Sequence, residues 1–248
     1  MKQAGTTNFV GSADAAHVLD PIPFQIDVAD IARRVHLPGT PEDNPEDWRD
    51  LAALVARFQT VGRPKAIIRL AAVTSHDANG VTIDGRHYFA SSTLAQRLAE
   101  QHRLWLHCAT CGQEVAPLAE GLDVFQQLWF EELKMALLRA AGKAVQDTIK
   151  RAYAVKSLAG MAPGSGDARV WPIEDLRTLF DAFSGQIQSA LGVELTDSML
   201  MLPNKTGAGV YFASDEAFAS CELCHRNNCP HRRRPFNQEL WEKTFPGQ

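Results

Sequence analysis

The sequence predicts an α+β fold: a single domain in which helices flank a mostly antiparallel twisted sheet, and three observations indicate it. Short, strand-like apolar runs occur in hairpin-like groups, and longer runs with helical periodicity lie between these groups. No internal repeat or low-complexity linker divides the 248 residues. A hydrophobic content of 45% is enough to build a buried core.

The N-terminal part is predicted to hold a flexible leader and two helices. Residues 1–21 are assigned to the leader. Apolar residues at helical spacing predict a helix over 24–37, which stops before Pro38. A stronger amphipathic helix is predicted over 45–61. Its apolar face holds Trp48, Leu51, Leu54, Val55 and Phe58.

Strand signals dominate the next stretch. A buried strand is predicted over 66–73, followed by a turn at Asn79-Gly80 and short strands at 81–83 and 87–90.

Two helices and a strand are predicted in the middle of the chain. Ser91 or Ser92 caps a helix over 93–101, and the alternation over 104–108 indicates a strand. The longest helical signal covers 124–155, where apolar residues keep a helical period past one glycine.

The last predicted elements complete the domain. Pro172 is placed in the first turn of a helix, and strands are predicted over 195–202 and 210–213. The core face of that helix is predicted to hold Ile173, Leu176, Phe180 and Phe183. The domain is expected to span 22–214, with a cysteine-bearing tail, 215–248, packed on it.

Composition and charge argue against a membrane protein, a secreted protein and a protein that binds nucleic acid through a global positive charge. The net charge is −4 and the pI about 6.1, so no global basic field attracts nucleic acid or anionic lipid. No apolar run approaches the roughly 20 residues that a membrane helix needs. Residues 1–16 are polar and lack the apolar segment of a signal peptide. We therefore expect a cytoplasmic protein.

Two glycine-bearing segments are the main candidates for a binding site. The first is Ala162-Pro163-Gly164-Ser165-Gly166-Asp167, and the second runs from Leu202 to Phe212 with Gly207 and Gly209 inside it. Glycine lets a ligand approach backbone N–H groups, so the two segments are predicted as the two lips of one cleft. The alternative is that both are ordinary turns or strand irregularities.

The order and spacing of these segments resemble one family. Pro-Gly-x-Gly-Asp, then Trp-Pro-x-Glu-Asp, and finally Pro-x-Lys-x-x-x-Gly-x-Tyr-Phe resemble the AdoMet-binding activation domain of cobalamin-dependent methionine synthase and its free-standing relatives. The resemblance runs from about residue 24 to 234 and is strongest over 162–212. It implies the fold of that domain.

The resemblance also implies a cofactor site. Tyr211 falls on a tyrosine that contacts AdoMet in the family, and Lys205 matches the free-standing relatives. The alternative for Tyr211 is a half-buried strand aromatic with a satisfied hydroxyl. The residues expected to bind AdoMet are Ala162, Pro163, Gly164, Ser165, Gly166, Asp167, Arg169, Lys205, Gly207, Gly209 and Tyr211.

The chain departs from the family pattern in the first segment. Gly160 and Ser165 stand where the family has Arg and Tyr, so a cation for the cofactor's carboxylate is missing. Arg169, in a three-residue insertion before Trp171, is hypothesised to restore it. The alternative is a surface arginine on a longer loop.

The tail carries the most chemically specific motif, Cys221-x-x-Cys224-x4-Cys229. Thiolates are soft metal ligands, and this spacing predicts a zinc or iron–sulfur site. Zinc needs a fourth ligand, either His225 or His231, whereas a cluster takes an external or distant one. Three reduced cysteines without metal are the alternative.

Cys108 and Cys111 have the spacing of a redox pair. The relatives have an apolar residue at the second position, so Cys111 is interpreted as a small core residue.

The resemblance implies a component of a cobalamin-dependent methyltransferase system. It would be an accessory protein for reductive reactivation of a corrinoid methyltransferase, such as a methionine synthase lacking its own activation domain. It would bind AdoMet and relay an electron to cob(II)alamin from a flavodoxin- or ferredoxin-type donor. Cobalamin would be met only through the partner protein.

Two other functions stay open. One is a non-catalytic corrinoid-protein docking or metal-binding module that has lost AdoMet binding. The other is a zinc-stabilised protein that binds nucleic acid through its arginine-rich tail, although a solvated basic tail is the plainer interpretation.

Overall fold

A seven-stranded sheet forms the centre of the molecule. The computed structural model describes residues 15–215, 218–229 and 232–247. In the sheet, β4, β3, β2, β5, β9 and β6 follow one another, β1 pairs with β2, and every strand pairing is antiparallel. The strands are β1 His17–Leu19, β2 Lys65–His76, β3 Val81–Ile83, β4 His87–Phe89, β5 Arg103–Thr110, β6 Leu158–Met161 and β9 Thr206–Ala213. The predicted fold class is confirmed.

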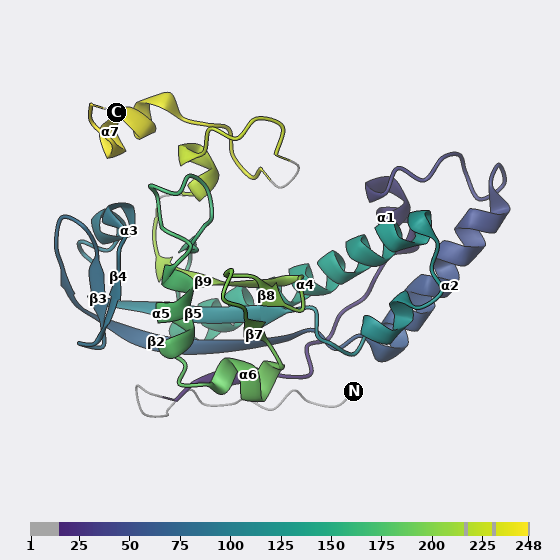
Figure 1. Ribbon diagram of the computed structural model, residues 1–248, viewed down its shortest axis with the longest axis horizontal. Coiled ribbons are helices and arrows are strands. Elements are labelled where there is room, and N and C mark those ends of the chain that lie inside the picture. The colour runs from purple at the N-terminus through teal and green to yellow at the C-terminus, as the bar shows by residue number, and fades with distance from the viewer. Residues whose placement is uncertain (1–14, 216–217, 230–231, 248) are drawn as a thin grey trace.

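Helices cover the sheet and extend beyond it. They are α1 Val28–Arg34, α2 Pro45–Val61, α3 Ser92–Arg97, α4 Val124–Tyr153, α5 Asp175–Asp181, α6 Gln186–Leu191 and α7 Gln238–Thr244, with single 3-10 turns η1 Ala116–Ala119 and η2 Ser220–Leu223. A small hairpin, β7 Glu194–Leu195 and β8 Met201–Leu202, lies outside the main sheet. The lobe formed by α1 and α2 stands at one end of an elongated molecule (Figure 1).

Both faces of the sheet are buried in the middle, as β5 illustrates. Leu104, Leu106 and Cys108 point into the main core, which α5 and α6 also line. Trp105 and Ala109 alternate with them and pack on the other face, against α4. The alternation of strand side chains therefore places two separate apolar clusters on the two faces.

The long helix α4 connects the sheet to the helical lobe. Asp123 caps its N-terminus and forms a capping box with Gln126, and the helix continues past Gly142 without a break. The N-terminal half of α4 packs against α1 and α2, and its C-terminal half packs on β2 and β5. Buried side chains along its length are Trp129, Phe130, Leu133, Leu137, Ala141, Val145 and Ile149.

Several predicted boundaries need correction at the N-terminus. Residues 17–19, assigned to the flexible leader, form β1 because they pair with residues 66–68 of β2. Residues 1–14 of the predicted leader lie outside the described part of the chain. The helix predicted over 24–37 starts only at Val28, because the Asp27 carboxylate accepts the Ala29 N–H and caps it.

Other boundaries differ in the second half. The strand predicted over 195–202 is the β7–β8 hairpin, because Thr196 and Leu200 bond to each other across a turn. The helix expected at Pro172 begins at Asp175, and Ile173 is 42% exposed instead of facing the core. The strand β6 was not predicted. In the described part of the chain, no helix has both the length and the apolar character that crossing a membrane requires.

Candidate functional site

The two glycine segments meet at β9. The second segment, in which a strand was predicted only from residue 210, is strand from Thr206 onward, because its backbone pairs with β5 on one side and with β6 on the other. Gly209 allows β6 to come close to this strand. A Cβ at Gly209 would lie 2.5 Å from the carbonyl oxygen of Met161 and 3.0 Å from the Cβ of Ala162. The first segment leaves the sheet at this point. The two segments are therefore neighbours, although one of the two expected lips is a central strand.

The first segment is a tight turn fixed by two glycines. Gly164 and Gly166 have φ values of 72° and 96°, in the left-handed region that glycine tolerates. Gly164 N–H donates to the Trp171 carbonyl at 2.9 Å. A Cβ at Gly166 would lie 3.0 Å from the carbonyl oxygen of Ser220, so this turn touches the C-terminal tail.

Tyr211 lies where the two segments adjoin. Its ring stacks on His107 with centroids 4.4 Å apart, and its hydroxyl accepts a hydrogen bond from Gln146 of α4 at 3.2 Å. Burial raises the pKa of Tyr211, while the Gln146 hydrogen bond and the charge of Arg233 act in the opposite direction. This environment is compatible with both interpretations of Tyr211: a residue that contacts AdoMet, and a strand aromatic whose hydroxyl is already hydrogen-bonded.

Gly160 explains why the ring has room. It pairs with Tyr211 across β6 and β9, and a Cβ at this position would lie 2.7 Å from the Tyr211 ring. The arginine that the family pattern has here is therefore incompatible with this position of the ring.

His107 is a neighbour that no sequence pattern indicated. Burial lowers its pKa to about 4, and the opposing influence is a hydrogen bond to the Gly209 backbone. Its Nδ1 is buried and has no hydrogen-bond partner among the described residues. The imidazole is therefore neutral near pH 7.

Lys205 lies apart from these residues. Its ammonium pairs with Glu131 of α4 at 3.1 Å, and Asn204 beside it accepts from Lys134 at 2.8 Å. Tyr211 follows Lys205 by six positions along the strand, which at the rise of a β-strand is about 20 Å. The structure thus uses Lys205 to attach the start of β9 to α4.

Asp167 and Arg169 form an ion pair that supports the tail. Arg169 Nε and Nη2 donate to the two Asp167 carboxylate oxygens at 2.9 and 3.1 Å, and this bond lowers the pKa of Asp167. The guanidinium lies 4.4 Å from the ring centroid of Trp241 in α7. The hypothesis that Arg169 offers a cation to a ligand is not supported by this packing.

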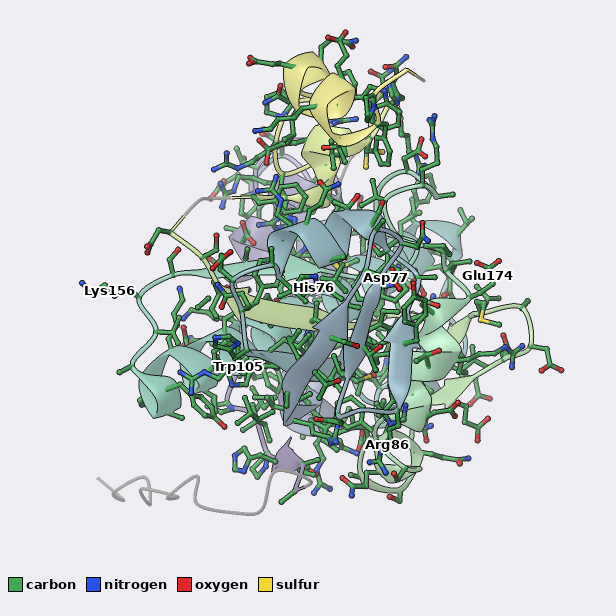
Figure 2. The ribbon with its side chains drawn as sticks, turned by 90° about the vertical axis from the view of Figure 1, so that its left-hand side faces the viewer. His76, Asp77, Arg86, Trp105, Lys156 and Glu174 are labelled. Atoms are coloured by element: carbon green, nitrogen blue, oxygen red, sulfur yellow. The ribbon has the colours of Figure 1, made fainter. Side chains whose placement is uncertain are left out.

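The tail lies against the edge of the sheet and closes a cavity. Ala219 forms a parallel bridge with Gly160, and the C-terminal segment stands above the sheet (Figures 1 and 2). A cavity of about 310 Å³ lies between the first glycine segment and the tail. Its lining is Gly164, Ser165, Gly166, Cys221, Cys224, Arg226, Cys229, Arg232 and Arg233. The sequence did not indicate that the cysteines and this glycine turn share one cavity.

The three predicted tail ligands share one cavity but do not surround a single point. Cys221, Cys224 and Cys229 are free thiols on one cavity wall, but within the described residues no three His, Cys, Asp or Glu side chains converge on a single ion. The His225 ring packs against the rings of Phe236 and Trp241, with centroid distances of 4.3 and 4.2 Å. This packing does not favour His225 as the fourth metal ligand. His231 lies outside the described residues.

Cys108 and Cys111 are core residues. They are fully buried in two different apolar clusters, and burial raises their pKa values to about 12 and about 11. The interpretation of Cys111 as a core residue is confirmed, and such thiols are unreactive.

The chain was compared with protein-family models, curated proteins and solved structures, and similarity was found among the solved structures. No protein-family model matches the sequence, and no curated protein matches it either. Among solved structures, the chain is similar to the crystal structure of the MetH reactivation domain bound to AdoHcy. The similarity covers 83% of this chain and 81% of that one, with 14% sequence identity and a TM-score of 0.55. The chain therefore has the fold of the MetH reactivation domain, as the resemblance in its motifs predicted.

Proposed function

We propose that this chain binds AdoMet and serves as an accessory protein in the reductive reactivation of a corrinoid methyltransferase. The observation that carries the proposal is the close approach of Ala162, where the Ala162–Asp167 turn begins, to Gly209 of β9, two residues before Tyr211, in a fold whose solved neighbour was crystallised with AdoHcy. AdoHcy is AdoMet without its transferable methyl group, so a site for one is chemically suited to the other.

The proposed site combines exposed backbone with an aromatic ring and a cation. The glycine turn lets a ligand come close to the backbone, although the Gly164 and Ser165 N–H groups are already used within the fold, and Tyr211 offers a ring edge and a hydroxyl. Arg233 lines the neighbouring cavity and its charge acts on Tyr211, so it supplies a cation for the ligand's carboxylate. Arg233 takes the role first assigned to Arg169, and Lys205 has no part in the site.

The chain's contribution to the chemistry is positioning. Reactivation needs a methyl group from AdoMet and one electron from a low-potential donor of the flavodoxin or ferredoxin type, and both are delivered to a corrinoid held by another polypeptide. The residues around Tyr211 would bind AdoMet and orient its methyl group toward that partner. We propose that it acts in the cytoplasm, together with the methyltransferase.

An AdoMet titration tests the proposal. We expect calorimetry to show saturable binding of AdoMet, with AdoHcy competing for the same site. Tyr211→Phe removes only the hydroxyl and is expected to weaken binding several-fold, since a hydrogen bond is worth about 1 kcal/mol. Tyr88→Phe, in the β3–β4 hairpin, is the matched control and should bind like the wild type. No binding by the folded wild-type chain would contradict the proposal.

A second candidate is a corrinoid-protein docking module that no longer binds AdoMet. The observation favouring it is the pair Gly160 and Tyr211: the family's arginine is absent, and the Tyr211 hydroxyl already has a partner in Gln146. This candidate predicts association with a corrinoid methyltransferase that is unchanged by added AdoMet. The first candidate predicts association that AdoMet strengthens.

A further inference from the structure

The three tail cysteines converge on one cavity although they come from an irregular segment. Cys221 lies within η2, Cys224 follows it, and Cys229 comes five residues later, yet all three line the same space of about 310 Å³. The Gly164–Gly166 turn lines the same cavity, and it lies close to Ser220 because Gly166 has no side chain. The fold thus encloses the thiols between two parts of the chain that are distant in sequence.

The segment that bears the thiols is held by its own hydrogen bonds. The Arg232 guanidinium donates to the carbonyls of Cys221 at 2.9 Å and Cys224 at 3.1 Å, and also to that of Arg226. The Glu222 carboxylate accepts the Ala219 N–H at 3.0 Å. These bonds fix the backbone of the segment, and the three cysteines, which form no disulfide, line the cavity.

The charge in the cavity suits an anionic group. Arg226, Arg232 and Arg233 contribute to the lining, and no carboxylate does so among the described residues. Three thiolates around an iron–sulfur core give a net negative charge, which neighbouring guanidinium groups stabilise.

The geometry favours a multinuclear group over a single zinc ion. A structural zinc site closes four ligands around one ion at about 2.0–2.3 Å. No three candidate ligands in the described part of the chain converge in this way, and His225 is packed between two aromatic rings. Three thiols that line one cavity are compatible instead with a cluster, in which each cysteine binds a different iron.

We propose that Cys221, Cys224 and Cys229 bind a [4Fe–4S] cluster through three of its irons, which leaves the fourth iron to an external ligand. This goes beyond the proposed function and does not depend on AdoMet binding. It would give the chain its own one-electron carrier beside the turn assigned to AdoMet.

Metal and sulfide analysis of the full chain tests this. Protein purified without oxygen and reconstituted with ferrous iron and sulfide is expected to hold about four irons and four sulfides per chain. We expect a broad visible absorption that bleaches with dithionite, and an electron paramagnetic resonance signal from the reduced form. Folded wild-type protein that binds no iron, or that holds one zinc without sulfide, would overturn the inference.

Variants identify the ligands. Cys221→Ser, Cys224→Ser and Cys229→Ser should each lose most of the cluster, whereas Cys108→Ala, in the main core, should keep it. Circular dichroism confirms that each variant is folded, and full iron retention in all three tail variants would refute the assignment. AdoMet titration of the same samples separates the two proposals, because a cluster without AdoMet binding removes only the proposed function.

Discussion

At the scale of single residues, the space around Tyr211 is set by what its neighbours lack. The ring occupies the volume that a side chain at position 160 would need, and it is fixed by stacking on His107 and by the hydrogen bond from Gln146. A chain that changes residue 160 must therefore also move this tyrosine. The residue at position 160 and the position of the Tyr211 ring are thus coupled.

This dependence gives a paired prediction about two glycines. Gly160→Ala would place a Cβ 2.7 Å from the Tyr211 ring, and such overpacking should lower the free energy of unfolding by about 1–3 kcal/mol. Gly142→Ala is the matched control, because its Cβ would meet nothing within 4 Å inside α4. It should raise stability by about 0.5–1 kcal/mol. Urea denaturation measures both, and a neutral Gly160→Ala would contradict the packing.

His107 predicts a pH dependence of stability. Its pKa is about 4 in the folded chain against 6.5 when unfolded, so between these values protons bind preferentially to the unfolded chain. The free energy of unfolding should therefore fall as the pH drops from 6.5 toward 4, with a contribution on the order of 3 kcal/mol. His107→Phe, which keeps the stacking on Tyr211, should flatten this slope, while exposed His102→Gln should not. Equal slopes in wild type and His107→Phe would show that another group is responsible.

At the scale of elements, the long helices α2 and α4 were predictable, whereas the short helices α6 and α7 and the sites of close approach were not. The helix over Pro45–Val61 and the strand over Val81–Ile83 have the predicted bounds, because their apolar periodicity and turn signals are local. Gly207 and Gly209 looked like a loop because composition does not tell a turn from a strand that a neighbour approaches closely. The short strand β6 has one small and one glycine residue in its centre and gives no period.

The candidate site was predictable only in part for the same reason. The glycine turn, Tyr211 and the cysteines carry recognisable motifs, so the sequence indicated them. Arg233 and His107 reach the site through the path of the tail and the register of β5 with β9, which only the folded structure defines.

Helix α7 provides a prediction at this scale. Arg169 bonds to Asp167 and lies over Trp241, so Arg169→Ala should loosen α7 by removing a cation–π contact worth about 0.5–2 kcal/mol. Hydrogen exchange should become faster over 238–244, while AdoMet affinity stays the same. Arg177→Ala, which removes an ion pair to the β7–β8 hairpin, should leave α7 unchanged. A loss of AdoMet affinity in Arg169→Ala would restore the original hypothesis for this residue.

At the scale of the whole molecule, the tail belongs to the main core. Leu223 is fully buried and Trp241 is 4% exposed, and both pack in the cluster that contains β5, α5 and α6. The bridge between Ala219 and Gly160 joins the same segment to the edge of the sheet. The cysteine-bearing cavity is therefore supported on one side by the core. The proposed cluster site needs such support, because its three cysteines must be held in position.

The tail and the sheet should consequently unfold together. Leu223→Ala leaves a cavity in the main core and should lower the free energy of unfolding by about 2–5 kcal/mol. Leu200→Ala, at a 62% exposed position, should change it by less than about 0.5 kcal/mol. In the wild type, tryptophan fluorescence, which includes Trp241 of α7, and far-ultraviolet circular dichroism should report one transition with the same midpoint. If α7 instead loses protection at a lower urea concentration than β5, the tail is a separately stable unit, and the cavity between them opens before the domain unfolds.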